Sequence, residues 1–221
     1  MPASEPRIID IGFDRLDEAA AVLAAAFEDY PLSRYIFDGH GSRYMEVMTA
    51  TYQMDCLWKL ELDWPILGIL AGSSLAAVAL VLDFSRDPHN PIPPDCPLYE
   101  MEDSLNRSFG PQTHARVLEY YAAKEAGKPS SPHLYLEEMG VLRSQRGKGF
   151  GGLLLQRINR LSEENPYSTG IGLDTQVPGN LSLYRHFGYQ VTSQRMIGPV
   201  PNWFMFCPTG KPNSHDAGTP F

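Results

Sequence analysis

A glycine-rich segment in the second half of the chain, RGKGFGG at residues 146–152, limits the possible folds more than any other feature. It follows an apolar stretch at 133–141, which is predicted to be a β-strand. It precedes residues 150–163, where apolar side chains recur at helical spacing. Four of the six residues 147–152 are glycines, which is more than a tight turn alone needs. In a strand–turn–helix of this kind, successive N–H groups and the helix N-terminus form an anion site, best suited to phosphate or pyrophosphate.

Charge is distributed unevenly around this segment. The 221 residues include 18 basic and 26 acidic side chains, a net charge of −8. Residues 139–162 contain no acidic residue, so the 13 basic side chains found elsewhere face all 26 acidic ones, a net charge of −13. The five basic residues within 139–162 are Arg143, Arg146, Lys148, Arg157 and Arg160. The acidic remainder argues against nucleic-acid binding, which requires a basic face, and is compatible with a cationic substrate.

Several classes of protein are disfavoured by what the sequence lacks. The three cysteines form no CxxC pair and the histidines show no HExxH spacing, so neither a disulfide framework nor a metal site is predicted. The uncharged stretch 64–82 is broken by Gly72-Ser73-Ser74, which indicates two short strands and not a membrane span. The N-terminus lacks the apolar core of a signal peptide. We therefore expect a cytoplasmic protein that binds neither nucleic acid nor membrane.

The other patterns predict one α/β domain built on a mixed, mostly antiparallel sheet flanked by helices. Strands are expected at 7–12, 66–70, 75–82, 133–141, 170–174, 189–197 and 203–207. Helices are expected at 16–27, 42–60, 98–126 (broken near Gly110-Pro111), 150–163 and 180–187. We assign residues 1–208 to a single domain with helical insertions at about 40–62 and 86–130, and residues 209–221 to a disordered tail.

The glycine pattern has one competing interpretation. Gly147, Gly149 and Gly152 also satisfy GxGxxG, and Asp174 lies 22 residues further on, near the position of a Rossmann ribose-binding carboxylate. However, residues 142–146 separate the strand from the first glycine, and only 69 residues follow Gly152. A P-loop is excluded because no Gly-Lys-Ser/Thr occurs at the required spacing.

Two segments together resemble the GCN5-related N-acetyltransferase (GNAT) superfamily. The segment RGKGFG at 146–151 matches its motif A, Gln/Arg-x-x-Gly-x-Gly/Ala, and NLSLYRHFGY at 180–189 resembles its motif B. The closing segment GPVPNWFM at 198–205 is most similar to puromycin N-acetyltransferase-like members. The resemblance implies the GNAT acyl-CoA N-acyltransferase fold and acetyl-coenzyme A (acetyl-CoA) as co-substrate.

The resemblance also implies which residues bind acetyl-CoA. In the family, backbone amides of motif A hold the pyrophosphate, and the preceding strand pairs with the pantetheine arm. Val177 stands where many members carry Asn, and Asn180 is the alternative contact. The expected coenzyme-binding residues are Met139, Gly140, Val141, Arg146, Gly147, Lys148, Gly149, Phe150, Gly151, Gly152 and Asn180.

Acetyl transfer to an amine needs a base, because an alkylammonium has a pKa of about 10.4, and a proton donor for the departing thiolate. Glu137 and Glu138 end the strand before the glycine-rich turn, and strand alternation predicts that they point to opposite faces. Leu136-Glu137-Glu138 resembles the Leu-Glu-Asp of spermidine/spermine acetyltransferases, which implies Glu137 as the base and Glu138 as second choice. Tyr184 matches the tyrosine that acts as general acid in the family.

We therefore predict an N-acetyltransferase that moves the acetyl group of acetyl-CoA to a primary amine of a small molecule by direct attack, as a monomer or homodimer. The alternatives are acetylation of a protein lysine or N-terminus, and a non-catalytic acyl-CoA- or dinucleotide-binding module. Acceptor specificity is expected from residues 27–35, 40–62 and 86–130. Aromatic residues there could line a pocket: Tyr30, Tyr35, Tyr44, Tyr52, Trp58, Tyr120 and Tyr121.

Overall fold

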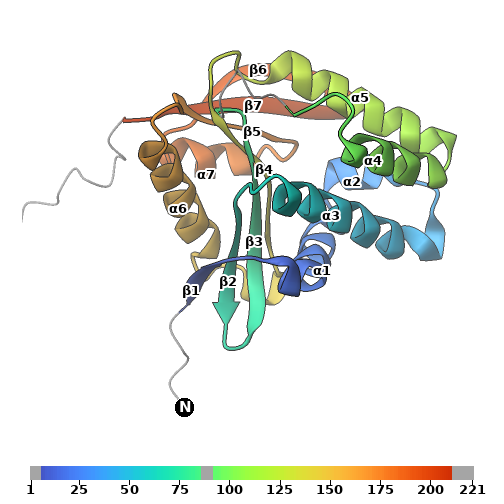
Figure 1. Ribbon diagram of the computed structural model, residues 1–221, viewed down its shortest axis with the longest axis horizontal. Helices are drawn as coiled ribbons and strands as arrows, with labels where there is room; N and C mark the ends of the chain where they lie inside the picture. Colours follow the sequence, from blue (N-terminus) through green and yellow to red (C-terminus); the bar gives the residue numbers. More distant parts are fainter. Residues whose placement is uncertain (1–5, 86–91, 211–221) are drawn as a thin grey trace, which may run out of the picture.

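Seven strands form one sheet with the order β1-β2-β3-β4-β5-β7-β6 in the computed structural model, which describes residues 6–85 and 92–210 (Figure 1). Neighbouring strands are antiparallel except β4 and β5, which run parallel. The predicted mixed, mostly antiparallel sheet is confirmed. The strands are β1 (Arg7–Asp10), β2 (Ile66–Ala71), β3 (Ser74–Asp83), β4 (Leu134–Val141), β5 (Gly170–Thr175), β6 (Gln190–Ile197) and β7 (Val200–Pro208).

The predicted helices are confirmed, and one further helix was not predicted. The helices are α1 (Leu16–Phe27), α2 (Pro31–Ile36), α3 (Tyr44–Glu61), α4 (Pro97–Ser108), α5 (Pro111–Gly127), α6 (Phe150–Glu164) and α7 (Asn180–His186). The break between α4 and α5 falls at Gly110, whose φ is +97°. The unpredicted α2 starts at Pro31, because the first helical position does not need an N–H donor.

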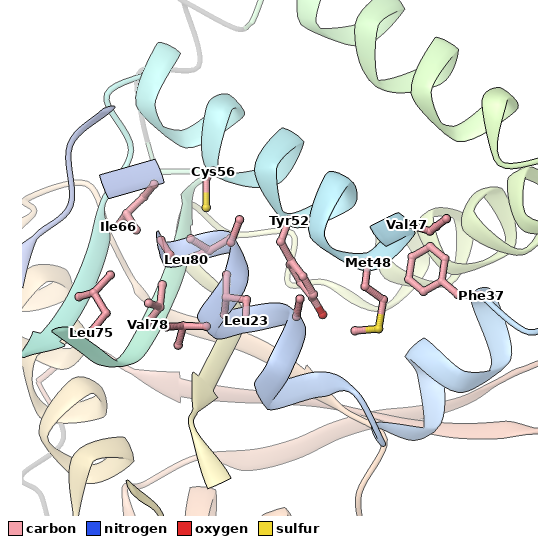
Figure 2. Close-up of a cluster of buried hydrophobic side chains, with 14 of the residues drawn as sticks. Leu23, Phe37, Val47, Met48, Tyr52, Cys56, Ile66, Leu75, Val78 and Leu80 are labelled. Atoms are coloured by element: carbon pink, nitrogen blue, oxygen red, sulfur yellow. The ribbon is translucent and has the colours of Figure 1, made fainter. Parts of the chain in front are cut away.

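Apolar side chains alternate along the central strands and give the sheet a core on each face. On β3, Val78 and Leu80 join a cluster with α1 and α3, whereas Ala79 and Val81 join a cluster with α6 and α7. Figure 1 shows α1 and α3 on the side of the sheet opposite to α6 and α7. Figure 2 shows the first cluster, in which Leu23 from α1 packs between α3 and the β2–β3 hairpin.

The sheet opens between its two parallel strands. Strands β4 and β5 pair only where Leu134–Leu136 face Ile171–Leu173, and β4 then continues to Val141 paired with β3 alone. Among the described residues, the other edge of 137–141 therefore has no strand partner. This divergence places unpaired backbone N–H and C=O groups at the centre of the molecule, where an extended ligand could pair with them.

A β-bulge interrupts β4 at the same place. Leu80 is paired with Glu138 and the next residue, Val81, with Leu136, so Glu137 is an extra residue on β4. Such a bulge shifts the alternation of side chains by one position. Leu136 and Met139 accordingly pack on the α6 face, and both glutamates lie on the face covered by α1 and α3. The expectation that Glu137 and Glu138 point to opposite faces is wrong for this reason.

The remaining sequence predictions concern segments at the edges of the fold. Residues 64–82 form β2, its turn and most of β3, as the hairpin interpretation predicted. Within the part of the chain that the structure describes, no helix has the length and apolar character needed to cross a bilayer. Residues 86–91 of the predicted insertion and 211–221 of the predicted tail lie outside the described residues.

Candidate active site

A cleft of about 460 Å³, here called the open cleft, lies where β4 and β5 diverge. Its walls are the end of α1 with the loop that follows, the last residues of β4, the glycine-rich turn and α7. It brings together predicted site residues that are distant in the sequence. The lining residues are Ala25, Ala26, Phe27, Asp29, Tyr30, Pro31, Met139, Gly140, Val141, Arg143, Arg146, Gly151, Val177, Asn180, Leu183 and Tyr184.

The glycine-rich turn continues the open cleft to the start of α6. Gly147 and Gly149 have φ values of +79° and +80°, and no atom lies within 4 Å of where a Cβ would stand on either. Phe150 begins the helix with its side chain buried in the core, and its backbone N–H is one of those that have no partner inside the helix. A Cβ on Gly152 would come within 3.2 Å of the Phe187 ring. The turn therefore presents backbone N–H groups at its surface, as an anion site requires.

The basic residues around the turn are partly neutralised by the protein itself. Arg143 pairs with Asp29 at 2.6 Å, and Arg157 on α6 pairs with Glu164 at 3.1 Å. Arg146 donates hydrogen bonds to the carbonyls of Val141 and Ala26, and Lys148 donates to the amide of Gln145. Within residues 6–85 and 92–210, neither Arg146 nor Lys148 has a carboxylate within ion-pair distance. Their charges are thus available to an anionic ligand.

Gly140 is a packing residue as well as part of the cleft wall. A Cβ at this position would lie 2.8 Å from Cβ of Ala26 and 3.1 Å from Leu23. The side of this glycine where a side chain would stand is therefore filled by α1. The hydrogen bond from the N–H of Leu142 to Ala76 means that Gly140 pairs with Val78 of β3, so the backbone groups on the unpaired edge of β4 are those of Met139 and Val141.

The wall opposite β4 is formed by α7. Asn180 begins this helix, and its side-chain amide donates to Oγ1 of Thr175 at 3.2 Å. Tyr184 lies one turn further along on the same side of the helix and is 8% exposed. Its ring packs edge-on against Tyr189, and its hydroxyl makes no hydrogen bond to the described residues. Burial raises the pKa of Tyr184, so the phenol keeps its proton at neutral pH.

A second, smaller hollow of about 100 Å³, here called the inner cavity, lies on the face covered by α1, α2, α3 and α5. Phe27 and Tyr30 line both it and the open cleft, so the two hollows meet at these rings. The hydroxyl of Tyr30 is held by Thr175 at 3.0 Å and by the N–H of Gln176 at 3.3 Å. The aromatic residues of the inner cavity are Phe27, Tyr30, Phe37, Tyr52, Tyr120 and Tyr121, and its carboxyl groups are Asp55, Glu137, Glu138 and Asp174.

Glu137 is fixed by two buried lysines. One carboxylate oxygen pairs with Lys59 of α3 and the other with Lys124 of α5, and all three side chains are at most 10% exposed. Burial alone would raise the pKa of Glu137, but Lys124 and Lys59 outweigh it and hold the pKa at about 2. A carboxylate with so low a pKa, and with both oxygens paired, is a poor proton acceptor near neutral pH.

Glu138 has the opposite properties. Its Oε2 is buried and has no hydrogen-bond partner among the described residues. Burial, the Glu137 charge and the Asp55 charge all raise the pKa of Glu138 well above its usual range. It stands on β4 directly before Met139, which lines the open cleft. Of the two glutamates, Glu138 therefore combines a free oxygen with an increased affinity for protons.

Asp55 completes this buried group of charges. It lies four residues before Lys59 on α3 and lines the inner cavity. Burial raises the pKa of Asp55 to about 7, although Lys59 opposes the increase. The sequence analysis did not identify Asp55, Lys59 or Lys124. The one available signal was a charged residue within a mainly apolar stretch of helix, and most such residues are solvent-exposed.

The predicted aromatic residues separate into two groups. Tyr30, Tyr52, Tyr120 and Tyr121 line the inner cavity. The other three bond elsewhere: Tyr35 to Glu119, Tyr44 to the carbonyl of Glu28 and Trp58 to Glu102.

Comparison with known proteins identifies the family. The sequence profile of the acetyltransferase (GNAT) family matches residues 79–189, which include the open cleft's strand, turn and helix α7. The chain therefore belongs to the GNAT acetyltransferase family and is an acyltransferase. Enzymes of this family use acetyl-CoA as co-substrate.

Solved structures with the same fold cover nearly the whole chain. One, described as histone acetyltransferase HPA2 and related acetyltransferase from Corynebacterium glutamicum, is 16% identical, with a TM-score of 0.60 over 94% of this chain and 98% of that one. Arylalkylamine N-acetyltransferase 2 from Aedes aegypti is 13% identical, with a TM-score of 0.59 over 92% and 98%. Polyamine N-acetyltransferase from Drosophila melanogaster is 14% identical, with a TM-score of 0.59 over 91% and 98%. At these identities the likeness concerns the fold alone.

Proposed function

We propose that this enzyme transfers the acetyl group of acetyl-CoA to a primary amine of a small cationic molecule by direct attack. Acetyl-CoA binds in the open cleft and the amine in the inner cavity. The observation that carries the proposal is Oε2 of Glu138, a buried oxygen without a partner among the described residues, on a residue that lines the inner cavity and directly precedes Met139 of the open cleft.

The open cleft fits the coenzyme in its shape and its chemistry. Backbone groups of Met139 and Val141 lie on an unpaired strand edge, where an extended pantetheine arm can form hydrogen bonds, and Gly140 lies between them. The N–H groups of the glycine-rich turn, with Arg146 and Lys148, offer donors and positive charge to a pyrophosphate. Asn180 lies on the opposite wall. When bound, acetyl-CoA supplies a thioester whose C–S bond breaks as the new C–N bond forms.

Glu138 is the general base in this proposal, in place of Glu137, which the sequence motif favoured. An ammonium substrate must lose a proton before its nitrogen can attack, and the raised pKa of Glu138 suits it to accept that proton. Glu137 stays ionised between Lys59 and Lys124. It keeps the bulge in place and, through its charge, raises the proton affinity of its neighbour.

Tyr184 is the general acid. Tyr184 lines the open cleft, its hydroxyl has no hydrogen-bond partner in the described part of the chain, and its pKa is raised by burial. It therefore holds, at Oη, the proton that a departing thiolate needs. Tyr184 lines the open cleft and Glu138 lines the inner cavity, so proton donation and proton removal are assigned to different residues.

The inner cavity supports a cationic acceptor of small cross-section. Apart from Glu137, which is paired with two lysines, the cavity holds three carboxyl groups whose pKa burial raises, and a bound ammonium group would favour their ionised forms; aromatic residues line the same cavity. Carboxylates and aromatic faces both attract an ammonium group. A volume of about 100 Å³ fits an aminoalkyl group and excludes a folded polypeptide surface. Acetylation of a protein lysine or N-terminus remains the alternative, since an extended peptide presents similar groups.

A thiol-release screen with acetyl-CoA and candidate acceptors (polyamines, aminoglycosides, amino acids and peptides) tests the proposal. We expect release with at least one small amine and a loss of at least about 10²-fold in kcat for Glu138→Gln, the magnitude usual for a general base. The control is Glu163→Gln, an exposed substitution on α6 that should change nothing. Release only with peptides would support the alternative, and tight NAD binding without CoA binding would contradict the proposal.

A further inference from the structure

The inner cavity continues into a larger hollow that the proposed mechanism does not use. A groove of about 460 Å³, here called the α4–α5 groove, lies along these two helices and the end of β3. It shares Asn106 and Tyr121 with the inner cavity, so the two hollows meet at these side chains. Figure 1 shows α4 and α5 side by side, above α2 and α3 in this view. Since a water molecule takes about 30 Å³, the inner cavity alone holds only a short aminoalkyl group.

Asn106 at this junction has unused hydrogen-bonding capacity. The residue is 5% exposed, yet its side-chain amide makes no hydrogen bond to the described residues. The amide N and O are not among the buried side-chain atoms that lack a partner in the described part of the chain, so they are open to the two hollows that the residue lines. A ligand that passes from the inner cavity into the groove can form hydrogen bonds with them.

Glu102 stands beyond Asn106 in the groove. It lies one helical turn earlier on α4, about 6 Å along the axis and on the same face. Its carboxylate is fixed by Nε1 of Trp58 at 3.1 Å and by the hydroxyl of Tyr121. Within the described ranges no lysine or arginine lies within ion-pair distance of it.

The other carboxylates of the groove already have cationic or imidazole partners. Asp103 pairs with Arg107 and contacts His114, and Glu125 pairs with Lys128. Glu102 is thus a carboxylate held by the hydrogen-bond donors of Trp58 and Tyr121, with no ion-pair partner in the described part of the chain. This combination suits a cationic group of a ligand.

We infer that the acceptor is an elongated amine with a second cationic group. The reacting amine lies at Glu138, the chain passes Asn106, and the second cation pairs with Glu102. This inference rests on the proposed function and specifies its substrate class. It makes Glu102 and Asn106 determinants of specificity that do not contact the reacting atoms.

Acceptor pairs matched in length test this inference. Thiol release would be measured for α,ω-diaminoalkanes from 1,4-diaminobutane to 1,8-diaminooctane, each against the n-alkylamine of equal carbon number. For at least one length we expect wild type to prefer the diamine by about tenfold or more in kcat/KM, mainly through KM, as a charge-assisted contact predicts. In Glu102→Gln this preference should disappear, because the amide oxygen can still accept from Trp58 and the amide NH2 can donate to the Tyr121 hydroxyl, but the side chain carries no charge.

Two further variants keep the test decisive. Glu100→Gln, on the exposed side of α4, should retain the diamine preference of wild type. Leu118→Trp, at a groove residue that is 51% exposed, should reduce the preference by filling the groove without disturbing the core. An equal diamine-to-monoamine ratio in wild type and Glu102→Gln would overturn the inference. If Glu138→Gln then still abolishes turnover of every amine, the proposed function stands and only the inference about a second cationic group is lost.

Discussion

Neutralising Glu137 should change the pH dependence of the enzyme without removing its base. In the proposed mechanism kcat/KM rises with pH as Glu138 loses its proton, and the neighbouring Glu137 charge raises the pH at which this happens. Glu137→Gln removes that charge and leaves Lys59 and Lys124 uncompensated. The acidic limb of the profile should therefore move to lower pH.

The size of the shift follows from the geometry of the bulge. Adjacent residues on one face place their carboxylates roughly 6 Å apart, which at an effective dielectric constant of about 20 corresponds to about 3 kcal/mol, or about two pH units. Lys124 lies beyond Glu137, and Lys124→Met should move the limb the other way by roughly one unit. The double variant Glu137→Gln/Lys124→Met loses one charge of each sign, so its acidic limb should lie between those of the two single variants, about one pH unit below wild type.

The assay is thiol release with a fixed amine over a range of pH. The pKa of the acceptor is common to all variants, so differences between their profiles report on Glu138. Leaving buried lysines unpaired costs about 3–5 kcal/mol, so thermal unfolding must first confirm that each variant is folded at the assay temperature. If folded Glu137→Gln loses turnover at every pH and Glu138→Gln does not, Glu137 is the base and the reasoning is refuted.

Three other changes test separate parts of the account. Tyr184→Phe should lower kcat by about 10²-fold with an unchanged dissociation constant for CoA in calorimetry; an unchanged kcat would exclude the acid role. Gly149→Ala should lower the free energy of unfolding by about 1–2 kcal/mol because the φ of this residue is +80°, and it should also weaken CoA binding. Gly140→Ala should lower the free energy of unfolding by about 1–3 kcal/mol because its Cβ would clash with Ala26. Urea unfolding measures both losses, and equal stability to wild type would contradict the packing. Because the folded pKa of Glu137 lies near 2, below its ordinary value of 4.5, its contribution is complete above about pH 4.5 and is lost as the pH falls toward 2. Wild type should therefore lose stability relative to Glu137→Gln over that range, and a constant difference would argue against the ion pairs.

The open cleft could be predicted from the sequence because its parts are local. The glycine-rich turn and the α7 segment each combine a backbone requirement with a spacing that a few neighbouring residues specify. Gly147 and Gly149 both adopt a positive φ, which glycine accommodates without strain. Tyr184 and Asn180 are on one helix, so a single prediction places both on the same wall.

The inner cavity could not be predicted, because long-range contacts define it. One extra residue in β4, visible only in the pairing with β3, brings Glu137 and Glu138 to the same face. The two lysines that pair with Glu137, Lys59 and Lys124, come from α3 and α5, which are far apart in the sequence. The alternation of apolar and polar residues along a strand does not reveal a bulge, so it predicted the wrong orientation for one of the two glutamates.

The most direct test compares amine-dependent thiol release from acetyl-CoA by wild type and Glu138→Gln, with CoA binding to both measured by calorimetry. The account predicts release by wild type with a small cationic amine, its loss in Glu138→Gln, and equal CoA affinity in the two proteins. Full turnover by Glu138→Gln would contradict the account, as would wild type that binds CoA but releases no thiol with any amine.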